Sequence, residues 1–229
     1  MSRPPAQQAG QPNQGAPTRM WNRFTNLGDL AVMLPLSATI AVWLAAQKQF
    51  SSSLRWLLAF GSAGLLVAIS KIAFIGWGIG SSDFDFTGIS GHTMLATATL
   101  PVLLYLLSRA WLPRHSTLAL AIGWLGGAAI GYSRLEVHAH SLSEVVLGFA
   151  CGLLASSWFA SKTAERYSSK AAVCLLIPAL VVFNLQFGNK APGQDIITRL
   201  ALAISQHEKP YSRTDLHAES MTGQNGRRP

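Results

Sequence analysis

Residues 56–82 read WLLAFGSAGLLVAISKIAFIGWGIGSS and contain a single charged residue, Lys71. An α-helix needs about 20 apolar residues to cross the roughly 30 Å of hydrocarbon in a bilayer, so this run is long enough to span a membrane. Apart from Lys71, charged residues are absent from the intervals 30–47, 56–82, 93–108, 116–133, 145–161 and 171–189. We therefore expect an all-α, polytopic membrane bundle with about six transmembrane helices.

The composition supports the same fold class. Hydrophobic residues make up 49% of the chain and charged residues 12%, against about 25% charged residues in an average soluble domain. The apolar runs lack the period-two alternation of a membrane β-barrel, which favours helices. The net charge of +8 does not indicate nucleic acid as a partner, because the basic residues are scattered between the apolar runs. Anionic lipid headgroups of the bilayer explain such a distribution.

Three regions follow from the distribution of apolar residues. Residues 1–28 are rich in Pro, Gln, Gly and Asn and are expected to be a disordered tail, and the apolar run after them starts too late and is too long for a cleavable signal peptide. Residues 29–189 are the predicted transmembrane domain. Residues 190–229 contain a short amphipathic stretch, either an interfacial membrane helix or a cover for one end of the bundle, and then a flexible tail.

The basic residues of the short loops predict the orientation, because positively charged loops tend to stay in the cytoplasm. One side holds Lys48, Arg55, Arg109, Arg114, Lys162, Arg166 and Lys170, and the other holds Arg19, Arg23, Arg134, Lys190 and Arg199. The first side has more positive charge and is predicted to be cytoplasmic. The loops around residues 80–91 and 133–141 would then face the periplasm from a bacterial inner membrane.

These two loops carry most of the polar residues that suggest chemistry. They hold His92, His138 and His140, and two predicted spans separate them, so they return to the same membrane face. Lys71 lies toward the matching end of its own span, and an ionisable residue inside the membrane is a functional candidate by default.

A phosphate ester suits this set of residues. Ser90 is placed to cap a helix whose free N–H groups could face an anion. Arg134 can bind two phosphate oxygens at once, and Lys71 can add a point charge. Glu144 follows His140 by four residues, which puts both on one face of a helix if the helix has begun. A carboxylate in that position orients an imidazole for nucleophilic attack.

At these residues the chain resembles the type 2 phosphatidic acid phosphatase (PAP2) superfamily, whose motifs are K-x6-RP, PSGH and SR-x5-H-x3-D. The second motif is similar to Ile89-Ser90-Gly91-His92, and the third to Ser133-Arg134, then His140, then Glu144 in place of aspartate. The resemblance implies a six-helix bundle that hydrolyses a phosphate monoester or diphosphate without a metal or other cofactor, through a phosphohistidine. It implies that His140 is the nucleophile, Glu144 its orienting carboxylate and His92 the general acid, and that the phosphate is held by Lys71, Ser90, Gly91 and Arg134.

The first motif departs from the family pattern. Gly78 and Ile79 stand where the family has Arg and Pro after Lys71. One phosphate-binding arginine is therefore missing, and among nearby groups a protonated His138 is the obvious substitute cation. The loss of such a contact typically lowers a rate by about a hundredfold or more.

The membrane setting makes a phosphorylated lipid the expected substrate: phosphatidic acid, phosphatidylglycerol phosphate, a polyprenyl diphosphate or lipid A phosphate. Two alternatives remain open at this stage. An inactive binder or transporter of phosphorylated lipid would explain the altered first motif. A membrane protein that binds a metal or haem through His92, His138 and His140 is also conceivable, although Lys71 and Arg134 would oppose a bound cation.

Overall fold

The computed structural model describes residues 20–21, 24–189 and 191–218. Helices dominate this part of the chain, and its strand-like pairing is limited to one isolated bridge between Ser81 and Phe86. The elements in chain order are η1 (Asn26–Gly28), α2 (Leu30–Ala46), α3 (Phe50–Trp77), α4 (Gly91–Trp111), η2 (Pro113–His115), α5 (Ser116–Glu136), α6 (Leu142–Ser161), α7 (Ser169–Gln186) and α8 (Gly193–Ser205).

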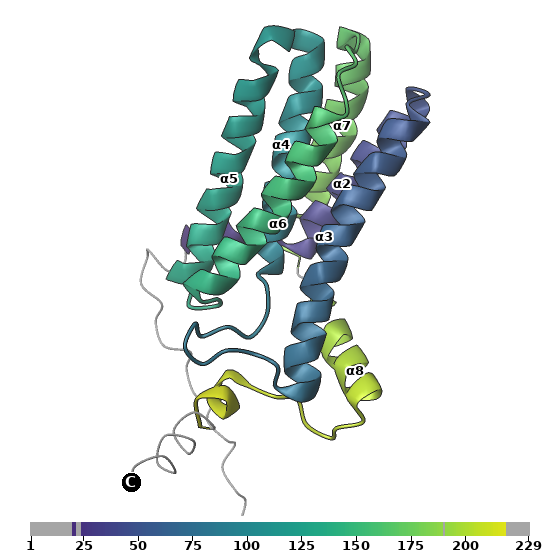
Figure 1. Cartoon of the computed structure of the whole chain (residues 1–229). Helices are drawn as coiled ribbons and strands as arrows, with labels where there is room; N and C mark the ends of the chain where they lie inside the picture. Colours follow the sequence, from purple (N-terminus) through teal and green to yellow (C-terminus); the bar gives the residue numbers. More distant parts are fainter. Residues whose placement is uncertain (1–19, 22–23, 190, 219–229) are drawn as a thin grey trace, which may run out of the picture.

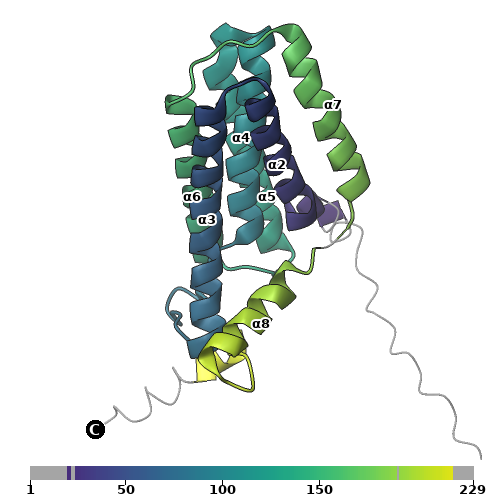
Figure 2. The same cartoon turned by 90° about the vertical axis from the view of Figure 1, so that its right-hand side faces the viewer.

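The prediction of an all-α, polytopic membrane bundle is confirmed. Within the described residues, five helices, α3 to α7, are long and apolar enough to cross a membrane, and α2 is a shorter apolar helix of 17 residues. Figures 1 and 2 show these helices side by side, with α8 lying at an angle across the lower end of the bundle. Large apolar side chains are exposed on the outer faces, among them Leu65, Ile122, Leu125, Leu154 and Ile177. Such a surface suits contact with lipid chains.

Helix α4 forms the centre of the bundle because small residues let its neighbours approach closely. A Cβ atom added to Gly127 of α5 would lie 2.4 Å from Thr97 Oγ1 of α4, and one added to Gly152 of α6 would lie 2.6 Å from the carbonyl oxygen of Met94. Glycine at these positions brings the helix backbones together, as small residues do in membrane helix packing. The starts of α4 and α6 are thereby held next to each other.

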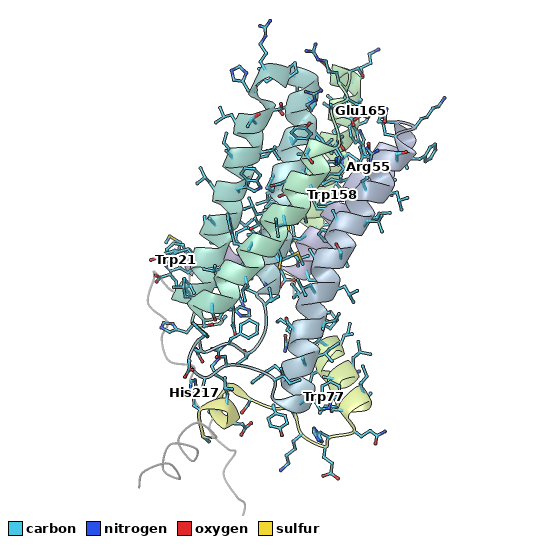
Figure 3. All side chains as sticks on the ribbon, viewed as in Figure 1. Trp21, Arg55, Trp77, Trp158, Glu165 and His217 are labelled. Carbon is cyan, nitrogen blue, oxygen red and sulfur yellow. The ribbon has the colours of Figure 1, made fainter. Side chains whose placement is uncertain are left out.

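The basic loops that were predicted to be cytoplasmic gather at one end of the bundle. Arg55 donates a hydrogen bond to the carbonyl oxygen of Lys162, and Arg109 donates one to that of Glu165. Figure 3 places Arg55 and Glu165 at the upper end, whereas Trp77, the last residue of α3, lies at the lower end. The loop between α3 and α4 therefore lies on the opposite side from these basic loops.

The two tail regions differ in part from what composition suggests. Residues 1–19 lie outside the described residues, but Thr25 and Gly28, which composition assigns to the N-terminal tail, are buried against the bundle. Residues 206–218 similarly lie against the end of α3 and the loop that follows it. Both segments make polar contacts at this end of the bundle: Thr25 accepts a hydrogen bond from Arg134, and Arg213 donates one to Glu144.

We expect substitution of Gly127 by alanine to lower the free energy of unfolding by about 1–3 kcal/mol, because the added methyl group overlaps Thr97. Thermal unfolding of the purified protein in detergent measures this change. Gly61→Ala is the matched control, because its Cβ would meet nothing within 4 Å. That control should be neutral or stabilising by up to about 1 kcal/mol through helix propensity, and equal destabilisation by both substitutions would contradict the packing argument.

Candidate active site

The predicted site residues come from four helix ends at the same end of the bundle. Helix α3 ends at Trp77 and α5 at Glu136, whereas α4 begins at Gly91 and α6 at Leu142. Because successive helices alternate in direction, these four ends meet at the lower end in Figure 1. The loop between α3 and α4 and the loop between α5 and α6 therefore face one another across the site.

His140 and Glu144 are in direct contact. Nδ1 of His140 lies 2.5 Å from Oε2 of Glu144. His140 precedes α6 instead of lying on it, and a capping box holds the two together: Ser141 is the N-cap, its hydroxyl accepts the N–H of Glu144, and Oε2 of Glu144 accepts the N–H of Ser141 at 3.2 Å. With Nδ1 engaged by the carboxylate, Nε2 is the ring nitrogen left for another group.

The carboxylate of Glu144 is fully buried. Its Oε1 atom accepts hydrogen bonds from the backbone N–H of Thr87 at 2.7 Å, from the Thr87 hydroxyl at 2.6 Å and from the guanidinium of Arg213 at 2.8 Å. A buried carboxylate is tolerated only when it is paired and hydrogen-bonded in this way. The backbone of Glu144 takes part as well, because its carbonyl oxygen accepts the N–H of Ser90 at 3.0 Å.

Lys71 lies in the second-to-last turn of α3 and points toward this end of the bundle. Its Nζ donates a hydrogen bond to Oε1 of Gln194 on α8, at 3.1 Å. The loop to α4 crosses directly over it at Gly88, whose φ of +141° suits glycine, and a Cβ there would lie 2.9 Å from Cγ of Lys71. The loop thus covers the base of the Lys71 side chain, and α8 holds its ammonium group.

Arg134 lies in the last turn of α5. One of its terminal nitrogens donates a hydrogen bond to the hydroxyl of Thr25 at 2.9 Å, and its buried Nε has no partner among the described residues. The ion pairs found in the described part of the chain leave Lys71 and Arg134 without a carboxylate partner. Two cations in this state are suited to bind an anion.

Ser90 is the N-cap of α4, as predicted, and Gly91 is the first residue of that helix. The hydroxyl of Ser90 is fully buried and lies 2.9 Å from that of Thr93. It makes no capping hydrogen bond to the first turn of α4. The first turn of α4 therefore keeps its positive dipole end toward the site.

His92 has a carboxylate partner that the sequence analysis did not identify. Its Nε2 lies 3.4 Å from Oδ2 of Asp29, the N-cap of α2. Burial raises the pKa of Asp29, but the interaction with His92 and the hydrogen bonds from the N–H groups of Ala31 and Ala191 outweigh that effect and lower the pKa to about 2. Asp29 is therefore an anion at physiological pH, and its carboxylate faces the imidazole of His92.

Comparison with known proteins adds to this geometry. The family model described as the PAP2 superfamily matches residues 73–168. This chain belongs to the PAP2 superfamily. The matched region includes His92, Arg134, His140 and Glu144 and begins two residues after Lys71.

Two relatives extend the match beyond that region. The chain is 37% identical over 210 residues to an uncharacterized 22.5 kDa protein in the cps region of Klebsiella pneumoniae, which covers 87% of this chain and 99% of that protein. It is 29% identical over 142 residues to phosphatidylglycerophosphatase B of Bacillus subtilis (strain 168), which covers 57% of this chain and 68% of that protein. No solved structure matches the chain.

Burial and the neighbouring charges of this PAP2 site shift the pKa of His140. Burial lowers the pKa of the His140 imidazole, the hydrogen bond to Glu144 raises it, and the positive charges of Lys71 and Arg134 lower it further. The net shift is downward from the ordinary value of 6.5. The imidazole is therefore neutral at pH 7, which is the state in which Nε2 can act as a nucleophile.

All seven residues predicted for the PAP2 site lie at this end of the bundle, and sequence reasoning missed five polar residues that support them. Thr25 and Asp29 precede α2, Thr87 lies in the loop after α3, and Gln194 and Arg213 lie in α8 and in the C-terminal segment. His138, the suggested substitute cation, is exposed on a left-handed turn (φ +53°). Among the described residues, no group of three His, Cys, Asp or Glu side chains is placed to hold a metal.

Asp29 offers a test of the interaction with His92. The carboxylate has a pKa of about 2 in the folded protein against an ordinary 3.8, so its contribution to stability is present above pH 3.8 and is lost as the pH falls toward 2. We expect Asp29→Asn, which keeps the N-cap, to lower the free energy of unfolding near pH 6 by about 2 kcal/mol. Thermal unfolding in detergent between pH 6 and pH 3 measures it.

The control is Asp195→Asn, which removes an exposed carboxylate from the first turn of α8. It should change stability by no more than about 0.5 kcal/mol. If Asp29→Asn unfolds like the parent protein at both ends of the pH range, Asp29 does not stabilise the protein through its charge.

Proposed function

We propose that this chain is a metal-independent lipid phosphatase that hydrolyses a phosphate monoester or diphosphate through a phosphohistidine. The observation that carries the proposal is the contact between His140 and Glu144 beside two cations, Lys71 and Arg134, that have no carboxylate partner among the described residues. Membership of the PAP2 superfamily and the similarity to phosphatidylglycerophosphatase B support a membrane phosphatase.

In the first step, Nε2 of His140 attacks the phosphorus atom while the bond from phosphorus to the lipid oxygen breaks. Glu144 keeps the proton on Nδ1 and stabilises the positive charge that develops on the ring. His92 gives its proton to the departing lipid oxygen, so the lipid leaves as a neutral alcohol or as a protonated monophosphate. Asp29 stabilises the protonated form of His92 that this step requires.

In the second step, a water molecule attacks the phosphohistidine. His92, now neutral, accepts a proton from that water, the bond between phosphorus and Nε2 breaks, and inorganic phosphate leaves. Lys71, Arg134 and the first turn of α4, with Ser90 and Gly91, hold the phosphoryl oxygens through both steps and balance their negative charge. These groups supply the positive charge that a metal ion provides in other phosphatases.

A groove in the apolar surface supports a lipid as the substrate. It has a volume of about 620 Å³ and lies between α3 and α6, lined by Ser62, Ala63, Leu66, Cys151, Ala155 and Trp158 among others. At about 1.5 Å per residue, Leu66 lies about 8 Å along α3 from Lys71, and Cys151 about 11 Å along α6 from Glu144. An acyl or prenyl chain in this groove would place its phosphate near the site.

The orientation of the molecule would give the site access to lipids of the outer leaflet. The basic loops lie at the end opposite the site, and positively charged loops tend to remain in the cytoplasm. The site would then face the periplasm of a bacterial inner membrane, where it meets phosphorylated headgroups at the level of the membrane surface.

We expect purified protein in detergent with EDTA to release inorganic phosphate from phosphatidylglycerol phosphate, phosphatidic acid or a polyprenyl diphosphate. His140→Ala should reduce kcat by at least about a thousandfold because it removes the nucleophile. His138→Ala is the matched control, since it removes an exposed imidazole of the same loop, and its kcat should stay within about twofold of the parent value.

Three other outcomes would point elsewhere. Phosphate-dependent lipid binding without turnover by folded protein would support the inactive binder or transporter. Activity that EDTA abolishes and zinc restores would support a metal site. Activity that survives in His140→Ala would assign the nucleophile to another group.

The groove gives a separate prediction about substrate length. We expect Ser62→Phe to fill it and to raise KM for a long-chain lipid phosphate by about tenfold, which corresponds to roughly 1.4 kcal/mol of lost apolar contact. The KM for a short-chain, water-soluble analogue should not change. Leu57→Phe, on the exposed surface of α3 outside the groove, is the control, and a parallel change in KM for both substrates would rule out the groove as the chain-binding site.

A further inference from the structure

The segment that follows α8 returns to the site. Its residues 206–218 run along the end of α3, where the N–H of Tyr211 donates to the carbonyl oxygen of Ile75 at 3.0 Å and Nδ1 of His207 lies 2.7 Å from the carbonyl oxygen of Gly76. In Figure 1 this segment, drawn in yellow, passes beneath the loop between α3 and α4, and Figure 3 shows His217 at the same end. The contacts place the segment against the candidate active site.

Arg213 reaches from this segment to the carboxylate of Glu144. One terminal nitrogen donates to the carbonyl oxygen of Asp85 at 2.8 Å and pairs with the Asp85 carboxylate. The other donates to Oε1 of Glu144 at 2.8 Å and to the Thr87 hydroxyl at 3.2 Å. The guanidinium thus joins the loop before α4 to the start of α6 through four acceptors.

Glu144 is shared between two groups that carry or acquire positive charge. Its Oε1 atom faces Arg213 and its Oε2 atom faces His140. We propose that Arg213 is a positioning residue of the active site, which holds Glu144 in place and limits how much of its negative charge acts on His140. This inference rests on the function proposed above, in which a neutral His140 attacks phosphorus.

The geometry favours this role over direct contact with the substrate. Both terminal nitrogens of Arg213 are engaged by Asp85, Thr87 and Glu144, and Arg213 approaches Glu144 at the oxygen that His140 does not use. The segment adds a positive charge beside the site in a chain that lacks the arginine of the first motif.

Other charged residues lie near His140, and a test of Arg213 must leave them unchanged. At this end of the bundle they are Lys71 of α3, His92 of α4, Arg134 of α5, Glu144 of α6 and Asp29 before α2, together with Asp85, His217 and Arg213 itself. Of these, Arg213 and His217 come from the C-terminal segment, and only Arg213 contacts Glu144. A substitution of Arg213 by glutamine leaves the rest of the set intact and keeps a hydrogen-bond donor for Oε1 of Glu144.

The test compares the parent, Arg213→Gln and Arg213→Lys, with Arg199→Gln as a control that removes an exposed arginine from α8. Removal of the guanidinium charge leaves the full negative charge of Glu144 to act on His140, so the imidazole becomes easier to protonate. We expect the acidic limb of kcat/KM in Arg213→Gln to move upward by about half to one pH unit, since solvent screens the partly exposed charge. At pH values below that limb, kcat/KM of Arg213→Gln should be about three- to tenfold lower than that of the parent. Arg213→Lys and the control should keep the pH profile of the parent.

A second measurement separates this inference from the proposed function. The titration of His140 is followed by NMR on histidine-labelled protein in detergent, with the signal assigned by its absence in His140→Asn. An upward shift of the His140 pKa in Arg213→Gln supports the inference even if the parent hydrolyses no lipid phosphate. Hydrolysis by the parent without that shift overturns this inference alone.

Three kinetic outcomes would overturn the positioning role. A uniform loss of activity at every pH in Arg213→Gln would assign Arg213 a purely structural role. A rise in KM with an unchanged acidic limb would place its guanidinium on the substrate. Faster turnover in Arg213→Gln would mean that the segment blocks the site.

Discussion

The buried carboxylate of Glu144 is the constraint on which this end of the molecule depends. It has no exposed surface, and an unpaired carboxylate in that position would strongly destabilise the fold. Its partners come from three parts of the chain: Thr87 in the loop after α3, His140 and Ser141 at the start of α6, and Arg213 near the C-terminus. The requirement to satisfy one charge therefore assembles the loops around the candidate nucleophile.

Close helix packing brings the two halves of the site together. A Cβ added to Gly148 of α6 would lie 2.6 Å from the carbonyl oxygen of Ser90, so the start of α4 rests directly on α6. The N–H of Ser90 in turn donates to the backbone of Glu144. The start of α4 and the start of α6, which follows the proposed nucleophile, are thus held by backbone contacts and small residues, which leave little freedom for relative movement.

The carboxylates of the site are paired within the protein, whereas two of its cations are not. Glu144 is satisfied by His140 and Arg213, Asp85 by Arg213 and His217, and Asp29 by His92 and two backbone N–H groups. Lys71 and Arg134 are the site cations that no carboxylate within the described residues neutralises. In the proposed function these two provide the attraction for the phosphate, and the carboxylates orient the histidines.

Local patterns in the sequence were enough to predict the class of fold and to place seven candidate site residues at one end of the bundle. Uninterrupted apolar runs dictate membrane helices, and His140 and Glu144 are only four residues apart in the sequence. The partners Thr25, Asp29, Thr87 and Arg213 were decided only by the tertiary structure. Each is an ordinary polar residue in a segment of unremarkable composition. Its role depends on contacts with residues that are far away in the sequence, up to 162 positions in the case of Asp29 and Ala191. Such contacts follow from how the helices pack, and no local pattern encodes them.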